Sequence, residues 1–316
     1  MSQSNTSIYG GQAVIEGVMF AGRNVHVTAV RKKDRTIDFL EVPKTEIGWV
    51  NKLKKIPLLR GIVGIIESSA KGAQHLNFSA ESFAEEEEGE GKAPAKEEKS
   101  GFSLSMILGV AVVGVLSFLM GKVIFTLVPV ILEQTLFGRF FQEHQIWHNI
   151  IEGLIKIVLL VSYIYFISLT PVIKRLFQYH GAEHKVISAY EAGVELNVRN
   201  VQQFSTLHYR CGSSFIVFTV IIGVIIYSFF TYDNMIDRII QRLVLLPVII
   251  GVSYEVLRFT NSLREVPVLR FLGYPGLWLQ KLTTKEPTDD QVEVSIASFN
   301  RMREAESRLT QSKASA

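Results

Sequence analysis

The sequence lacks the paired cysteines, the excess of one charge and the N-terminal signal that would assign it to several common classes. Its single cysteine, Cys211, excludes an intramolecular disulfide, so folding does not require an oxidising compartment. Lys and Arg outnumber Asp and Glu by only 33 to 30, and no basic stripe is interleaved with aromatic residues, so nucleic acid is not an expected partner. The polar start, Met1 to Gly10, has no charged-then-apolar pattern, so a later apolar segment is expected to direct membrane insertion.

Hydrophobic residues are abundant instead, at 48% of the chain, and they occur in clusters. Runs of about 18 or more apolar residues are typical of membrane-spanning helices rather than of a soluble core. The predicted fold is therefore mainly α: a four-helix polytopic membrane domain over residues 102–262, with a small N-terminal β unit and a cytoplasmic metal-binding loop at 171–213. The four spans are predicted near residues 103–132, 149–170, 214–231 and 243–260.

The N-terminal part, residues 1–80, begins with a short β pattern. Residues 8–43 contain the alternating stretch Val25 to Val30, followed by a charged turn and a second stretch from Thr36 to Val42. Pro43 is expected to close this antiparallel unit.

The rest of the N-terminal part has a helical pattern. Over residues 45–80, apolar residues lie three and four apart with lysines between them, which suits either a membrane surface or packing on the β unit. Pro57 is expected to break this helix in two. Residues 81–101 include a run of four glutamates and are predicted to form a disordered acidic linker.

The distribution of Lys and Arg near the spans predicts the orientation in the membrane. The 171–213 loop is rich in them, whereas the first external loop has only Arg139, and the second has Arg238 and Arg242 beside two aspartates. We therefore expect a multi-pass protein of the bacterial inner membrane with this loop and both termini in the cytoplasm. Residues 263–316 would form a cytoplasmic C-terminal tail, and the oligomeric state is left open.

Three of the seven histidines and the only cysteine lie in the 171–213 loop. His180 and His184 are four residues apart, so on a helix their rings lie about 40° apart and can reach one ion. His208 and Cys211 are three apart and form a second pair of a kind that binds zinc. Glu191 lies between His180 and His184 in angle, two turns further on, and is a fifth candidate ligand. Imidazole and thiolate favour zinc among divalent metals, with iron left open.

Glu183 completes the string His180-x-x-Glu183-His184, which matches the inverted zinc-protease motif. On a helix it lies about 60° from His180, where it can reach a water on the metal without being a ligand, so it is the candidate catalytic base. Four nitrogen and sulfur ligands would make the site closed and structural, whereas three would leave room for chemistry. Plainer interpretations stay open: surface histidines, Cys211 as a small core residue, and Glu191 as a solvated side chain.

Four segments occur in the order Gly10 to Met19, Pro57 to Gly61, Tyr179 to Lys185 and His208 to Phe215. Together they resemble the YqhQ-like family of bacterial membrane proteins of unknown function. The resemblance covers roughly residues 8–285, and it implies a predicted metal-dependent enzyme without an agreed substrate. It supports the architecture and the metal site but supplies no reaction. Tyr209 stands where a proline is expected in relatives.

Two functions from different classes follow. The first is a zinc-dependent hydrolase at the cytoplasmic membrane face, in which Arg210, Lys185 and the basic 45–80 helix attract an anionic lipid-linked or peptide substrate. The second is a non-enzymatic membrane adaptor or regulator in which a structural zinc staples the loop. A transporter is disfavoured, because the spans contain almost no ionisable residues. Glu16 is expected on the polar face of a strand or facing the loop site, and Glu255 is expected to pair with Arg258 one turn later.

Overall fold

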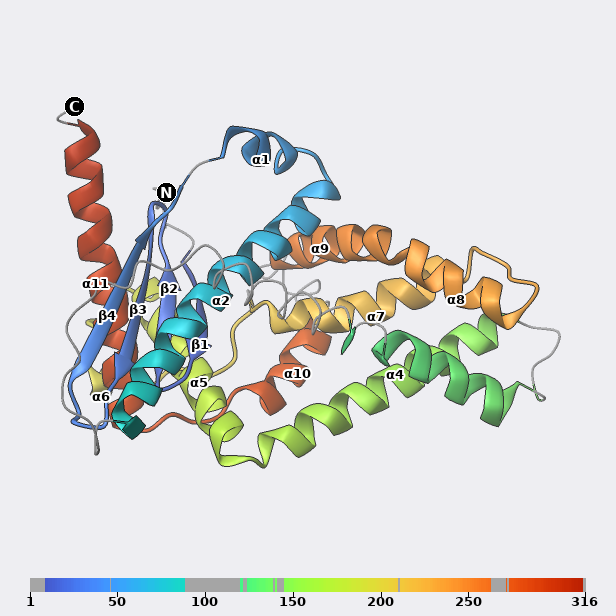
Figure 1. Ribbon diagram of the computed structural model, residues 1–316, viewed down its shortest axis with the longest axis horizontal. Coiled ribbons are helices and arrows are strands. Elements are labelled where there is room, and N and C mark those ends of the chain that lie inside the picture. The colour runs from blue at the N-terminus through green and yellow to red at the C-terminus, as the bar shows by residue number, and fades with distance from the viewer. Residues whose placement is uncertain are drawn as a thin grey trace.

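Helices form most of the chain, and a four-stranded sheet lies near its N-terminal end in the computed structural model (Figure 1). The expectation of a mainly helical fold with a small N-terminal β unit is therefore confirmed. The structure describes the following residues: 9–45, 47–88, 120–121, 124–138, 140, 145–209, 211–262, 271 and 273–314.

The sheet is an antiparallel meander in which each strand pairs with the next one along the chain. The turn between the first two strands contains Glu16, whose φ of 52° lies in the left-handed region, and its carboxylate accepts a hydrogen bond from Arg175 Nε at 2.5 Å. Gly17 follows because a Cβ there would lie 2.1 Å from the carbonyl oxygen of Ala29. Glu16 is thus a paired turn residue and not part of a strand face. The strands are β1 (Gly10–Val14), β2 (Gly17–Ala21), β3 (Val25–Arg31) and β4 (Ile37–Pro43).

Helices cover both faces of the sheet (Figure 1). On one face, α5 (Pro171–Glu191), α6 (Val198–Val201) and α11 (Asp289–Ala314) enclose the main core. On the other face lies α2 (Leu59–Glu88), where His75 Nδ1 is 2.6 Å from Thr28 Oγ1 on β3. Successive strand residues point to opposite faces, so the neighbours of Thr28 join the main core. This core includes Val18, Phe20, Val25, Val27, Ala29, Tyr179, Val186, Phe299 and Met302.

The stretch expected to be a C-terminal tail is part of this folded unit. Phe299 and Met302 of α11 are fully buried against the sheet. The same stretch contains α10 (Tyr274–Thr283), which packs on α7. Within this stretch, α10 therefore belongs to the helical part of the molecule and α11 to the sheet-bearing part.

The helical pattern after the sheet is interrupted near Pro57, as predicted, because α1 (Gly48–Leu53) ends before it and α2 begins after it. The predicted acidic linker, 81–101, begins too early, since α2 continues to Glu88. Glutamate has a good helix propensity, and a run of glutamates does not by itself end a helix. Residues 89–101 lie outside the described residues.

A second group of helices extends side by side away from the sheet (Figure 1). Within it, α7 packs between α4 and α9, and it also contacts α10. The helices are α4 (Gln145–Ser168), α7 (Ser213–Tyr227), α8 (Met235–Val244) and α9 (Leu246–Ser262).

Among the described residues, one helix, Ile146–Ser168, is long and apolar enough to cross a membrane. The helices α8 and α9 meet this criterion only together, and a bend of 47° separates them. Two further apolar helices, Ile124–Phe137 and Ser213–Tyr227, are shorter. The described residues thus contain one or two helices of spanning length rather than the four expected, and most of the predicted span at 103–132 lies outside them.

Charged side chains are buried at the far end of this helical group. Arg238, which was expected in an external loop, is fully buried and donates to Glu133 at 2.6 Å and to Glu152 at 2.8 Å. Arg242, also fully buried, donates to Glu152 at 2.8 Å, and His148 Nδ1 lies 2.5 Å from Glu133. Among these residues only Glu152 lies within a predicted span, and the opposite charges pair with one another inside the helical group.

Candidate metal centre

The two histidines of the predicted metal site lie on α5, which is packed on both sides. The helix begins with Pro171 at its first turn, where the missing N–H of proline has no cost. From Tyr179 to Ala189 nearly every residue is buried. The sheet lies on one side, and on the other lie Thr206, the end of α10 at Thr283 and the irregular residues 284–286. The first half of the predicted loop at 171–213 is therefore a helix, and that helix is buried mainly from Tyr179 to Ala189.

Gly181 allows one of these segments to approach the helix. A Cβ at this position would lie 2.1 Å from the carbonyl oxygen of Lys285. Lys285 N in turn donates to the carbonyl of Phe177 at 2.9 Å. The glycine in the His-Gly-Ala-Glu-His string is thus required for close backbone packing, which brings the carbonyl of Thr283 to the ring of His180.

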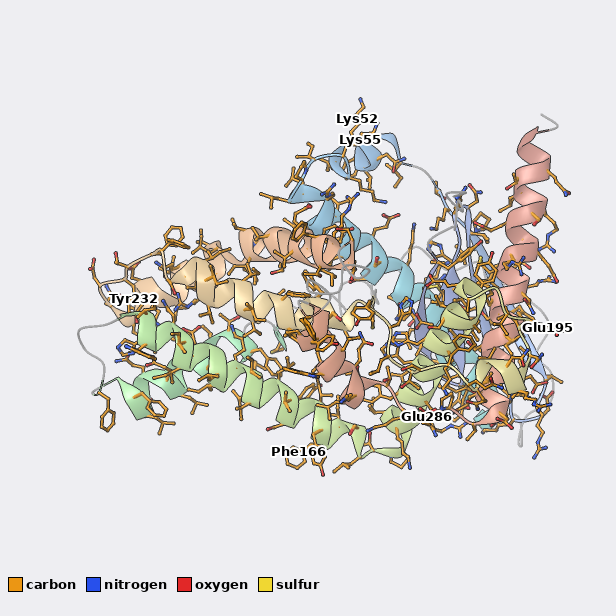
Figure 2. All side chains as sticks on the ribbon, turned by 180° about the vertical axis from the view of Figure 1, so that it is seen from behind. Lys52, Lys55, Phe166, Glu195, Tyr232 and Glu286 are labelled. Carbon is orange, nitrogen blue, oxygen red and sulfur yellow. The ribbon has the colours of Figure 1, made fainter. Side chains whose placement is uncertain are left out.

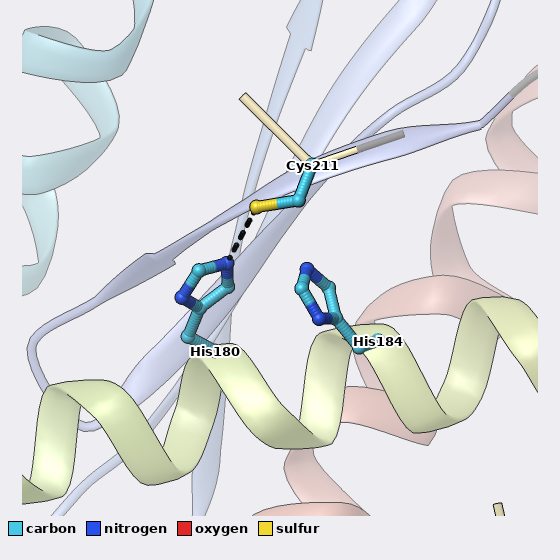
Figure 3. Close-up of side chains that lie close together, drawn as sticks. All are labelled: His180, His184 and Cys211. Carbon is cyan, nitrogen blue, oxygen red and sulfur yellow. Dashed lines mark hydrogen bonds between the residues drawn. The ribbon is translucent and has the colours of Figure 1, made fainter. Parts of the chain in front are cut away.

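His180, His184 and Cys211 converge at one point (Figure 3). Their nearest potential ligand atoms lie within 4.8 Å of one another, and His180 Nε2 is 3.3 Å from Cys211 Sγ. The two imidazole rings are 4.5 Å apart between centroids. Around a tetrahedral zinc ion, nitrogen and sulfur ligands lie roughly 3.3–3.8 Å apart. The triad therefore fits such an ion after side-chain movements of about 1 Å.

Backbone carbonyls orient both rings for this purpose. His180 Nδ1 lies 2.8 Å from the carbonyl oxygen of Thr283, and His184 Nδ1 lies 2.5 Å from that of Thr206. A carbonyl oxygen only accepts hydrogen bonds, so each Nδ1 carries the proton and each Nε2 is unprotonated; that of His180 accepts from the Cys211 thiol. Metal-binding histidines commonly have this arrangement.

Burial favours the neutral forms of His184 and Cys211. It holds the pKa of His184 well below its usual range, and His180 lowers it further. Burial also raises the pKa of the Cys211 thiol, although hydrogen bonds with Ser213 act in the opposite direction. Neutral imidazole is the form that binds metals, and a divalent cation supplies the charge that stabilises a thiolate. The donor set and its charge state thus fit zinc.

Glu183 points from α5 towards β1 rather than towards the segment that carries Cys211. It is buried, and its carboxylate accepts a hydrogen bond from the backbone N–H of Gly11. A Cβ at Gly11 would lie 2.8 Å from Glu183 Cδ, so a side chain there would displace the carboxyl group. Burial raises the pKa of Glu183 to about 8, an effect that His180 reduces and Cys211 increases.

His208 and Glu191 lie beside the triad. The His208 ring centroid is 5.6 Å from that of His184, and its Nε2 is 3.7 Å from Glu191 Oε2. Gln280 on α10 fixes the His208 backbone by accepting from its N–H at 2.9 Å and donating to its carbonyl at 2.8 Å. The structure therefore brings together three of the five predicted ligands and leaves His208 and Glu191 as a neighbouring pair.

A cavity of about 350 Å³ opens beside the triad. Glu183 and His208 line it together with the three triad residues, whereas Glu191 does not. Its size lies in the range of small-molecule sites. The remaining lining residues are Tyr9, Gly10, Gly11, Gln12, Ala13, Leu176, Phe177, Ile187, Gly212 and Ser213.

Several contributors to the site had no sequence signal. Thr206 and Thr283 act through backbone carbonyls, which any residue type provides, and Gln280 lies 72 residues from its partner. Lys185, expected at lipid head groups, is buried and donates to the carbonyl of Gln202 and to Glu286. Arg210 lies outside the described residues.

The fold and the site define a mainly helical protein that has a small sheet, a group of apolar helices and a His-His-Cys cluster of which His184 and Cys211 are buried. The chain belongs to the family described as protein of unknown function (DUF1385), which matches residues 56–305. It is 54% identical over 295 residues to the "Uncharacterized protein YqhQ" of Bacillus subtilis (strain 168), covering 93% of this chain and 92% of that protein. No solved structure matches it. The resemblance to a YqhQ-like family of unknown function is thereby confirmed.

Proposed function

We propose that this protein is a membrane-embedded zinc-dependent hydrolase that acts at the cytoplasmic membrane face. The observation that carries the proposal is the convergence of His180, His184 and Cys211 beside a cavity that also contains a buried carboxyl group, Glu183. Three protein ligands with an open position are typical of catalytic zinc sites.

Membrane embedding is supported by the outer surfaces of the apolar helices. On α4, Leu154, Val158 and Phe166 are mostly exposed, and Figure 2 shows Phe166 directed away from the helical group. Exposed apolar residues repeated along a helix are typical of contact with lipid. The large hydrophobic residues of this surface also include Ile157, Val161, Tyr165 and Leu169.

The helix α8 supports the same interpretation, because its arginines are buried and several of its apolar residues are exposed. Arg238 and Arg242 are fully buried, whereas Ile236 and Val244 are 70% and 67% exposed. In water an amphipathic helix buries its apolar face. A helix that exposes isoleucine and buries paired arginines is suited to an apolar environment.

When bound, zinc supplies Lewis acidity that makes water acidic near neutral pH. The chain provides the remaining parts of a hydrolytic site. His180 and His184 are held by carbonyls in the tautomer that leaves Nε2 as ligand. Glu183 is held by the Gly11 N–H at the edge of the same cavity, where its carboxylate, once ionised, would accept a proton from water and return it to a leaving group.

The alternative is a non-enzymatic membrane adaptor or regulator in which a structural zinc ties α5 to the 205–211 segment. It is supported by His208, whose ring lies 5.6 Å from that of His184 and lines the same cavity. A change of side-chain position would add a fourth ligand and close the site.

The proposal is tested by the metal content and coordination of the purified full-length protein. We expect about one zinc ion per chain by mass spectrometry and three protein ligands plus one oxygen by X-ray absorption. The variant His184→Ala should lose the metal, whereas Gly64→Ala, a change on α2 where a Cβ meets no atom within 4 Å, should keep it. A metal-free protein that His184→Ala does not alter would overturn both the enzymatic and the structural zinc proposals. Four nitrogen and sulfur ligands would favour the structural one.

A further inference from the structure

A second cavity lies across β1 from the metal centre. It has a volume of about 480 Å³ and lies between the sheet and the α1–α2 segment. Among its lining residues are His26 on β3 and Lys71 on α2, which belong to the face of the sheet opposite α5. The first cavity is lined from the α5 side, by His180 and Glu183 among others. The two cavities thus occupy opposite faces of the same sheet.

The second cavity is strongly basic. Four cationic side chains line it, and Glu67 is the single carboxylate among its lining residues. Burial lowers the pKa of His26 to about 3, with a further contribution from Lys44, so this histidine adds no charge near neutral pH. The cationic residues are Arg23, Lys44, Lys54 and Lys71.

Glu67 balances only part of this charge. It forms ion pairs with Lys54 and with Lys71, the latter at 2.5 Å. Lys44 donates to the carbonyl of Gly22 at 2.5 Å, and its pKa is lowered by burial and by the neighbouring charge of Lys71. Repulsion between lysines that are partly removed from water makes a bound anion favourable. Asn51, Thr45 and Ser68 add neutral hydrogen-bonding groups to the same wall.

The two cavities share a wall made of Gly10, Gly11 and Gln12, because all three residues line both. β1 is the edge strand of the sheet, so no further strand separates the cavities on its outer side. Gly10 and Gly11 have no side chains, and a Cβ at Gly10 would meet no atom within 4 Å. A ligand that extends across this edge can therefore reach both the basic cavity and the metal centre.

We propose that the basic cavity binds a phosphate group of the substrate whose hydrolysis the metal centre carries out. This inference rests on the proposed hydrolase and names the substrate class as phosphorylated. Lysines and an arginine around a polar cavity are suited to phosphate oxygens, which accept several charge-assisted hydrogen bonds. The phosphate belongs either to a lipid headgroup or to a soluble molecule.

Next to the cavity, the chain exposes several large apolar residues between lysines. Trp49 is 67% exposed on α1, and Ile47, Ile56, Leu58 and Leu59 are exposed nearby. Lys52 and Lys55 belong to the same segment, and Figure 2 shows them at the outer surface of α1. Tryptophan and lysine in this combination are typical of the membrane interface, so a headgroup phosphate would approach the cavity from there.

The experiment measures phosphate binding and zinc content on the same detergent-purified full-length protein. Inorganic phosphate is titrated by calorimetry, and vesicles of phosphatidylglycerol and phosphatidylcholine are compared with vesicles of phosphatidylcholine alone. We expect the double variant Lys44→Gln/Lys71→Gln to bind phosphate at least about tenfold more weakly with zinc unchanged. The matched control Lys52→Gln/Lys55→Gln, which alters two lysines outside the cavity, should bind phosphate like the wild type.

A variant expected to strengthen phosphate binding distinguishes a specific effect from loss of binding through misfolding. Glu67→Gln removes the single lining carboxylate, so phosphate binding should become about threefold tighter. Unchanged phosphate affinity in both Lys44→Gln/Lys71→Gln and Glu67→Gln would overturn the inference. So would phosphate binding that disappears when zinc is removed by chelation, because the anion would then be bound at the metal.

The two proposals fail in different ways. If His184→Ala loses zinc but still binds phosphate, the subsite stands independently of catalysis. If the protein holds no zinc yet binds phosphate through Lys44 and Lys71, the hydrolase proposal fails and the anion site remains. Binding to the phosphatidylglycerol vesicles that the Lys44 and Lys71 changes abolish would assign the phosphate to a lipid headgroup.

Discussion

Arg60 on α2 and Glu255 on α9 form a two-point ion pair that joins the sheet-bearing part of the molecule to the apolar helices. Arg60 Nε lies 2.7 Å from Glu255 Oε1, and a second guanidinium nitrogen contacts the other carboxylate oxygen. Glu255 Oε1 also accepts from the backbone N–H of Leu58 at 3.2 Å. The glycine after Arg60 packs on Tyr254, where a Cβ would lie 2.6 Å from the tyrosine Cβ. The Pro57 to Gly61 motif is thus a docking element.

Removing this ion pair should loosen the connection between the two parts. Because both side chains are only partly buried, we expect Arg60→Gln to lower the melting temperature by a small but measurable amount. Thermal unfolding in detergent checks the value. In a double-mutant cycle with Glu255→Gln the two effects should not add, and full additivity would contradict the interaction.

Adding a methyl group at Gly181 should damage the metal centre without touching a ligand. A Cβ there meets the Lys285 carbonyl at 2.1 Å, so the 283–286 segment must move and the carbonyl of Thr283 leaves His180. We expect Gly181→Ala to weaken zinc binding by about 10- to 100-fold. Competition with a zinc chelator measures this. Gly64→Ala is the matched control, since it should keep wild-type zinc affinity and raise stability slightly.

The two zinc proposals predict opposite rankings of two variants. In the hydrolase, Glu183→Gln keeps zinc but lowers turnover of a chromogenic ester by about 100-fold or more, because only proton transfer is lost. Cys211→Ser loses zinc in either case. If Glu183→Gln has the same ester turnover as the wild type while Cys211→Ser unfolds the segment that carries Cys211, the structural-zinc proposal is supported. Zinc content and limited proteolysis of both variants distinguish the outcomes.

Acid should destabilise the contact between α2 and the sheet. Burial lowers the pKa of His26 to about 3 and that of His75 to about 4, and Lys44, Lys71 and Glu67 also act on His26. Both histidines titrate near 6.5 when unfolded, so below this pH the unfolded chain binds more protons and the folded state loses stability. We expect a loss on the order of 1 kcal/mol per pH unit for each histidine as pH falls from about 6.5 to 4. Denaturant unfolding of His75→Gln should show a shallower dependence, and an unchanged slope would contradict this origin.

Removing a carboxylate from the buried charge cluster should lower stability more than shortening a side chain on the exposed side of α8. Arg242 donates to Glu152 and to Asn149 Oδ1 at 2.6 Å, and both arginine and glutamate are buried. Glu152→Gln leaves the arginine charge partly uncompensated, so we expect a loss of about 3–5 kcal/mol. Ile236→Ala, on the exposed side of α8, should change stability little in detergent. Size-exclusion profiles and thermal unfolding report both.

The sequence predicted what depends on local spacing. The four-residue separation of His180 and His184 is a property of one helix, so it correctly placed both rings on one face. The His208 and Cys211 pair lies in irregular backbone, where spacing does not determine direction, and the structure joins Cys211 to His180 and His208 to Glu191. Contacts between distant segments had no local signal.

Glu255 is an example of a contact between distant segments that the local sequence did not indicate. Arg258 was the expected partner because it lies one turn away on the same helix. The actual hydrogen-bonding partner, Arg60, is 195 residues away and has the same charge, so nothing in the local sequence distinguished them. The core position of α11 was missed for a related reason. Its apolar residues are separated by many charges, and only the presence of the sheet explains their burial.

The carbonyl of Thr283 that orients His180 is supplied 103 residues later in the chain. A ribosome that has just finished α5 has therefore exposed both imidazoles but not the groups that fix them. If the site binds zinc as proposed, binding with the final geometry has to wait until α7, α8 and α9 have been synthesised and α10 has followed them. The order of synthesis thus delays completion of the His-His-Cys site until α10 has been made, because only then is the carbonyl of Thr283 present to orient His180.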